Sequence, residues 1–240
     1  MKHEYKQLTF SDHMEMHIYL ENLLYRKMEE CGIKGNTAAV ALSGGTTPKE
    51  FFRYLSGRNK ALLKETAAFF QVDERFVPHD HSDNNSRMIE EELIKPAGLK
   101  MWFPVNTACN NIQIAADEYE HVLSSSSQIR KNTTGTPVFD CILLGIGDDG
   151  HTASLFPETD AISVSDRFVI GVSPAGKQER ISLTLPVLSA AENLVFLVAG
   201  DNKKAIMHDL FNSDRQIPVR TVIENNPNSV ILCDSQACPG

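Results

Sequence analysis

Hydrophobic residues gather into short apolar runs, which alternate along the chain with segments whose apolar residues recur at helical spacing. The runs are bounded by Gly, Pro, Asp or Asn, as is typical of buried strands. We expect strands at residues 37–42, 67–72, 138–144, 168–172, 194–199, 219–223 and 230–233, a β-like run at 181–185, and helices at 12–30, 83–94, 112–123 and 202–210.

Polar and special residues mark several helix ends. Asp12 is a suitable N-cap for the first helix, and Gly32 follows as its stop. Thr47 is expected to cap a second helix, with Pro48 at its first position, and Pro96 is expected to close the helix at 83–94.

Strands interleaved with helices predict an α/β fold. We expect a mostly parallel, doubly wound (Rossmann-like) sheet with helices on both faces, and a few extra short strands towards the C-terminal half. No linker-like segment or internal repeat interrupts the 240 residues, so we expect residues 1–240 to form a single domain.

The composition limits which classes of partner the protein is expected to bind. The net charge of −8 and the lack of a Lys/Arg block argue against nucleic-acid binding. No stretch of about 18 apolar residues occurs, and the first six residues have no apolar core of a signal peptide, which argues against membranes and secretion. We expect a cytoplasmic monomer or small homo-oligomer that binds a small molecule.

The five cysteines are scattered and form no CxxC pair. An odd, scattered set favours free thiols in a reducing compartment over a disulfide framework or a zinc site. Their positions are Cys31, Cys109, Cys141, Cys233 and Cys238.

Four polar turns follow four of the predicted strands, at residues 43–47, 73–75, 147–151 and 200–203. If these strands are parallel, all four turns lie at the carboxyl edge of the sheet. Open α/β folds bind their ligands at that edge. The sequence therefore predicts one site built from segments that are remote along the chain.

The first turn, residues 43–47, suits an anion. Two glycines let the backbone approach a ligand, and the helix that starts there favours a phosphate through its free N–H groups and its dipole. The alternative is an ordinary strand–turn–helix connection in which the glycines serve only to make the turn tight. The candidate phosphate-binding residues are Ser43, Gly44, Gly45, Thr46 and Thr47.

Four cations could complete such a site. Lys203 and Lys204 lie in the first turn of a predicted helix, where a positive charge opposes the helix dipole unless an anion binds there. Arg75 and Arg180 could each donate two hydrogen bonds to a phosphate or to a carboxylate oxygen. The alternatives are solvated lysines, a local ion pair for Arg75 and an exposed arginine at 180. Of the two lysines, Lys203 is nearer the strand end and is the better candidate.

His151 is the candidate general base. It follows Gly150 and two aspartates at the end of a predicted strand, where Asp149 can orient the imidazole. A lone histidine more often has a structural role. The assignment of His151 as a base therefore depends on its position among glycines and aspartates. Residues 79–83 hold two histidines and two aspartates but form a polar, loop-like segment, and we expect no metal site there. Histidines 13, 17, 121 and 208 are expected to have no chemical role.

These segments resemble those of the 6-phosphogluconolactonases, within the wider family that includes glucosamine-6-phosphate deaminases. The pattern GxGxDGHxASLFP at 145–157 is specific, because the deaminases share its DGH core but continue differently. The other matching segments, in the same order, lie at 43–48, 73–78, 85–86, 180–184 and 200–203.

The resemblance implies hydrolysis of 6-phospho-D-glucono-1,5-lactone to 6-phosphogluconate, without a metal or organic cofactor. It implies that His151 activates water and that Asp149 orients the His151 imidazole. It also implies that the substrate phosphate binds the 43–47 turn with Lys203 and one arginine. Arg75 is expected to stabilise the oxyanion or bind phosphate, and Asp73 matches a position near the sugar. Two other functions remain open: a glucosamine-6-phosphate deaminase, and a sugar-phosphate sensor without catalysis.

Overall fold

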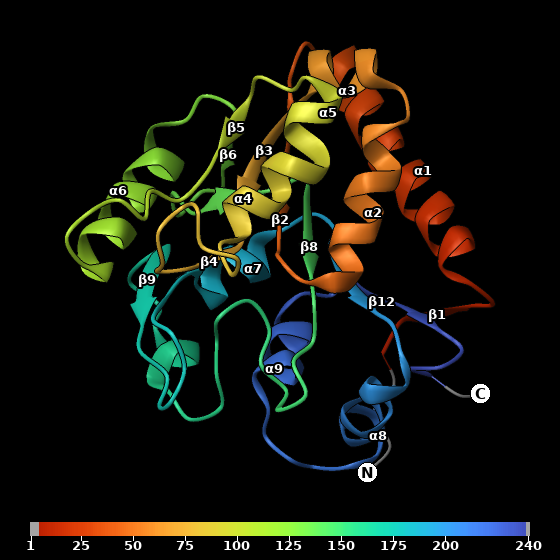
Figure 1. Ribbon diagram of the computed structural model, residues 1–240, viewed down its shortest axis with the longest axis vertical. Coiled ribbons are helices and arrows are strands. Elements are labelled where there is room, and N and C mark those ends of the chain that lie inside the picture. The colour runs from red at the N-terminus through yellow and green to blue at the C-terminus, as the bar shows by residue number, and fades with distance from the viewer. Residues whose placement is uncertain (1–4, 239–240) are drawn as a thin grey trace.

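A parallel sheet of seven strands forms the centre of the computed structural model, which describes residues 5–238 (Figure 1). The predicted fold class is confirmed. Part of the N-terminal hexapeptide considered above, residues 1–4, lies outside the described residues. The strand order is β1 (Gln7–Phe10), β12 (Ser229–Asp234), β11 (Leu194–Val198), β8 (Cys141–Leu144), β2 (Ala38–Leu42), β3 (Ala67–Gln71) and β5 (Trp102–Phe103), and neighbouring strands pair in parallel.

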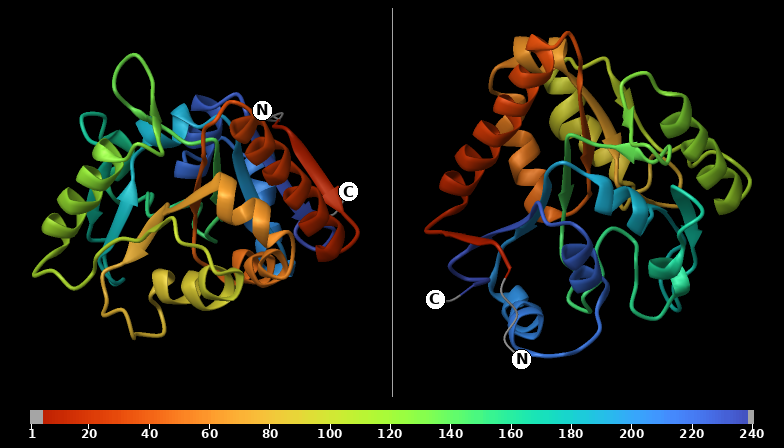
Figure 2. Two further views of the ribbon diagram at one scale, coloured as in Figure 1. Left: turned by 90° about the horizontal axis from the view of Figure 1, so that it is seen from above. Right: turned by 180° about the vertical axis from the view of Figure 1, so that it is seen from behind.

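Helices cover both faces of this sheet, and Figure 2 shows α1 and α6 on opposite sides of it. Side chains of β2 alternate between the two cores, which explains its unbroken apolar run. One face carries α1 (His13–Ile33), α2 (Thr46–Ser56), α3 (Lys60–Thr66), α4 (Asn85–Ile89), the π-helix η1 (Glu90–Ile94) and α5 (Lys95–Ala97). The other carries α6 (Ile112–Ser125), α7 (Leu185–Ala190), α8 (Lys204–Asn212) and α9 (Pro218–Asn225), with the 3₁₀ turns η2 (Asp160–Ser163) and η3 (Asp201–Lys203) nearby in sequence.

A second, antiparallel sheet contains β4 (Asp73–Arg75), β10 (Arg180–Leu183) and β9 (Val169–Val172). The expected extra strands are thus present. Residues 73–75 were expected to form a turn, and that prediction is wrong, because they pair with β10. A hairpin of β6 (Arg130–Lys131) and β7 (Pro137–Val138) splits the strand expected at 138–144, with β8 starting only at Cys141.

Residues 219–223 were expected to form a closing strand, but they belong to helix α9. The β-branched residues there favour a strand locally. However, Val219, Val222 and Ile223 have helical spacing and are buried together, and Pro218 at the first helical position favours a helix start. Tertiary packing therefore overrides the local strand preference.

Three helix ends also differ from expectation. Gly32 does not stop α1, because the helix continues through it to Ile33. Gly45, not Thr47, is the N-cap of α2, and no side chain caps that helix, so the hydroxyls of Thr46 and Thr47 are not used for capping. Pro96 does not close the helix at 83–94, because the π-helix before it accommodates the missing N–H and the helix runs on to Gly98. The predicted cap of α1 is confirmed, since Asp12 accepts the backbone N–H of Glu15 at 2.9 Å.

Cys233 and Cys238 are paired in a disulfide, so the expectation of free thiols is wrong for these two residues. The chain turns back after β12 and brings their Cα atoms to 6.2 Å, within disulfide range. The other three cysteines are free.

Among residues 5–238, no helix combines the length and hydropathy that crossing a membrane would require.

Candidate active site

A cavity of about 670 Å³ opens at the carboxyl edge of the parallel sheet. This volume is typical of small-molecule sites. The 43–47 turn follows β2, the 145–151 loop follows β8 and Gly200 follows β11, while β4 and β10 supply a further wall. Of the candidate site residues, the cavity is lined by Ser43, Gly44, Gly45, Thr46, Thr47, Asp73, Arg75, His151, Arg180 and Lys203.

Asp149 does not line the cavity but lies against His151. Its Oδ1 is 2.5 Å from His151 Nδ1 and accepts the backbone N–H of His151 at 3.0 Å. Lys177 donates to the other oxygen, Oδ2, at 2.7 Å. Partial burial raises the pKa of Asp149, but the hydrogen bonds from Lys177 and His151 outweigh it and hold that pKa well below the usual range.

An ionised Asp149 determines the tautomer of His151. A carboxylate can only accept, so in the neutral imidazole Nδ1 carries the proton and the lone pair lies on Nε2. The imidazole is about one-third exposed, and its face packs on Phe156 with ring centroids 4.4 Å apart. This arrangement suits a general base: Asp149 fixes the imidazole through Nδ1, and Nε2 stays available to accept a proton.

The 145–151 loop is shaped for this ring. A Cβ on Gly147 would lie 2.1 Å from His151 Nδ1 and Cε1, so only glycine leaves room for the imidazole. Two backbone hydrogen bonds close the loop, from Gly147 N–H to His151 O at 2.8 Å and from Gly150 N–H to Gly147 O at 2.9 Å. Further along, Ala153 has a positive φ of 51°, which is uncommon for a residue with a side chain.

Two arginines stand side by side in the cavity wall. Arg75 on β4 and Arg180 on β10 are direct partners in the antiparallel register. The Nε atoms of both are buried without a hydrogen-bond partner among residues 5–238. Burial lowers the pKa of Arg180, and the charge of Arg75 lowers it further. Two adjacent guanidinium groups of this kind suit a dianion.

Asp73 lies on the same ladder as the arginines, opposite Ser182. It is buried, and its Oδ2 accepts the hydroxyl of Ser154 at 2.7 Å, which ties β4 to the segment after His151. The hydroxyl oxygen of Ser43 is also buried without a partner in the described part of the chain.

Lys203 connects two of the turns. Its Nζ donates to Ile146 O at 2.8 Å and to Asp148 Oδ1 at 2.6 Å. Lys203 was expected in the first turn of a helix, but it ends the 3₁₀ turn η3 and is the N-cap of α8, with its ammonium group beside the 145–151 loop. The neighbouring Lys204 pairs with Asp201 and does not line the cavity.

Sequence reasoning missed several lining residues. Lys177 comes from the turn before β10, and its ammonium lies 4.4 Å from the centroid of the Phe156 ring. His13, which was expected to have no chemical role, also lines the cavity and contacts Glu50 and Asp234 at 3.0 Å each. Burial lowers the pKa of His13, but its bonds with Asp234 and Glu50 outweigh this and raise the pKa overall. Spacing alone carries no signal for either residue.

Within residues 5–238, no group of three or more His, Cys, Asp or Glu side chains is placed to hold a metal. In the segment 79–83, His79 contacts Glu90, and His81 contacts Asp83.

A model of the family described as "Glucosamine-6-phosphate isomerases/6-phosphogluconolactonase" matches residues 11–232. The chain is 38% identical over 206 residues to a 6-phosphogluconolactonase of Synechocystis sp., which covers 82% of each protein.

Solved structures agree with that match. A 6-phosphogluconolactonase from Trypanosoma cruzi superposes with a TM-score of 0.85 at 26% identity, covering 99% of this chain and 97% of the other. A monomeric glucosamine-6-phosphate deaminase superposes with a TM-score of 0.78 at 15% identity, covering 97% and 98%, and thus shares the fold.

Proposed function

The chain belongs to the family of glucosamine-6-phosphate isomerases and 6-phosphogluconolactonases, and from this we propose that it hydrolyses 6-phospho-D-glucono-1,5-lactone to 6-phosphogluconate. This is the second step of the oxidative pentose phosphate pathway. The observation that carries the proposal is His151, which is bound through Nδ1 to Asp149 and lines a cavity that is also lined by the cations Arg75, Arg180 and Lys203. The ASLFP sequence that follows His151 supports a lactonase over a deaminase.

His151 acts as the general base in this proposal. Its Nε2 removes a proton from water as the water oxygen attacks the lactone carbon. The imidazolium then returns the proton to the ring oxygen as the C–O bond breaks, which leaves an open-chain acid. Asp149 stabilises the imidazolium and keeps the ring oriented, and Lys177 in turn holds the second oxygen of Asp149.

The substrate phosphate binds in the same cavity. We assign it to the 43–47 turn, with Lys203 and the Arg75–Arg180 pair supplying positive charge. Because Arg75 and Arg180 are register partners, we assign both to the same anion. Asp73 takes a position near the sugar ring, where Ser154 fixes one of its oxygens.

We propose that residues 1–240 form one domain and act as a monomer or small homo-oligomer in the cytoplasm. The three free cysteines favour that location, whereas a disulfide such as Cys233–Cys238 is more common in oxidising compartments.

Acid release tests the function directly. Freshly prepared lactone is added to the purified protein at constant pH, and the base needed to neutralise the product is recorded. We expect release well above the spontaneous rate, and no ammonia when glucosamine 6-phosphate is supplied instead. Ammonia release without lactone hydrolysis would identify the protein as a deaminase, and neither reaction would favour a sensor.

A further inference from the structure

Asn85, the first residue of α4, lies beside the proposed phosphate turn. It is 3% exposed and lines the cavity. Its Nδ2 donates to the backbone oxygen of Asp73 at 3.1 Å. No side chain or backbone group among residues 5–238 donates to its Oδ1, and that atom is not among the buried unpartnered ones, so it remains open to the cavity.

The carboxamide of Asn85 is held flat against Gly44. A Cβ on Gly44 would lie 1.9 Å from Asn85 Oδ1 and 2.3 Å from its Cγ. Gly44 does not adopt a positive φ, unlike the next residue, Gly45, at 124°. Room for the Asn85 side chain, rather than backbone conformation, therefore explains the glycine at position 44.

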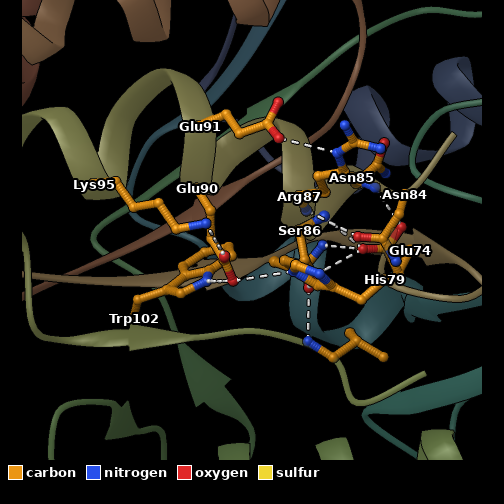
Figure 3. A network of polar contacts seen from close by, with 12 residues as sticks. Glu74, His79, Asn84, Asn85, Ser86, Arg87, Glu90, Glu91, Lys95 and Trp102 are labelled. Carbon is orange, nitrogen blue, oxygen red and sulfur yellow. Dashed lines mark hydrogen bonds and ion pairs between the residues drawn. The ribbon is translucent and has the colours of Figure 1, made fainter. Parts of the chain in front are cut away.

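A buried carboxylate fixes the backbone that carries Asn85. Glu74 is fully buried and accepts the N–H groups of Asn85 and Ser86 at 2.7 Å each. Figure 3 shows the Glu74 carboxylate directed at the start of α4, between these residues. Gln71 and Arg75 also donate to it, at 2.8 and 2.7 Å. Glu74 thus connects the position of Asn85 to strand β4.

The chemistry of Asn85 differs from that of its neighbours. Arg75, Arg180 and Lys203 can only donate hydrogen bonds, whereas the Asn85 oxygen can only accept them. An acceptor is needed to recognise the O–H of a sugar. Asp73 is a charged acceptor in the same cavity, and Asn85 adds a neutral acceptor beside the phosphate turn, where a second carboxylate would repel the phosphate.

We propose that Asn85 is a specificity-determining residue whose Oδ1 accepts a hydrogen bond from one ring hydroxyl of the sugar lactone. This inference rests on the proposed lactonase function. It predicts that the enzyme distinguishes its substrate from a deoxy analogue, because the buried acceptor is left unpaired when that hydroxyl is missing.

The test measures kcat/KM on the phosphorylated lactone and on its 2-deoxy, 3-deoxy and 4-deoxy analogues, for the wild type and Asn85→Ala. We expect the wild type to lose about 10-fold on one analogue. We expect Asn85→Ala to lose about 10-fold on the parent lactone and to lose nothing further on that same analogue.

Asn84→Ser is the matched control. Asn84 is equally buried and caps α4 by accepting the N–H of Arg87 at 2.8 Å, but it does not line the cavity, and serine keeps the cap. Its ratios among the four lactones should match those of the wild type.

Each outcome of the test is decisive. An equal loss by Asn85→Ala on all four lactones would mean a purely structural role and overturn the inference. If Asn85→Ala fails to fold, equal wild-type activity on all four lactones would overturn it as well. A wild type that is inactive on the parent lactone would instead refute the proposed function.

Discussion

Replacing His151 with alanine should lower kcat for lactone hydrolysis by about 10²–10⁴-fold, the usual loss for a general base. Without the imidazole, the proposed reaction has no base to remove the proton from the attacking water. The imidazole is about one-third exposed, so its removal should affect stability less than activity. Titration of acid release measures kcat, and thermal unfolding reports whether the variant is folded.

His208→Ala is the matched control for that experiment. His208 is exposed on α8 and does not line the cavity, so the variant should keep wild-type kcat. A folded His151→Ala protein that retained full kcat would remove His151 from the role of base.

Gly147→Ala should reduce kcat by about 100-fold, although the substitution removes no polar group from the site. The new methyl carbon would lie 2.1 Å from the His151 ring, and the loop's backbone hydrogen bonds leave little room for the backbone to move. The ring must therefore turn away from Asp149, and a displacement of this size can cost two orders of magnitude in rate. Acid release at saturating lactone measures the effect.

Gly145→Ala is the control on the same loop. A Cβ there would meet nothing within 4 Å, and Gly145 does not adopt a positive φ, so the loss should be much smaller. Equal losses in the two variants would indicate a general loop disturbance and contradict the explanation based on the ring.

The central sheet could be anticipated because its strands are buried on both faces. That burial requires continuous apolar runs, and β2, β3, β11 and β12 were expected within a few residues of their observed positions. Helix α9 was not anticipated, because its valines favour a strand locally and only their packing makes them helical. The short strand β4 was mistaken for a turn because it contains no apolar residue.

Most candidate site residues could be found because strand ends in a parallel sheet share an edge. The position of a glycine or histidine after a strand is visible in the sequence, whereas contacts between separate turns are not. The bond from Lys177 to Asp149 joins residues 28 apart along the chain. Likewise, the sequence suggests that Gly44 leaves space for a ligand, whereas in the structure the carboxamide of Asn85 occupies that space.

The central claim is that one cavity binds the phosphate and places the reacting carbon beside His151. A crystal structure with 6-phosphogluconate bound tests this claim most directly. We expect the phosphate on the 43–47 turn, within hydrogen-bond distance of Lys203 and Arg180, and the carboxylate beside His151 Nε2. A sugar phosphate bound away from Gly44, Gly45 and Lys203, or with its carboxylate remote from His151, would contradict the account.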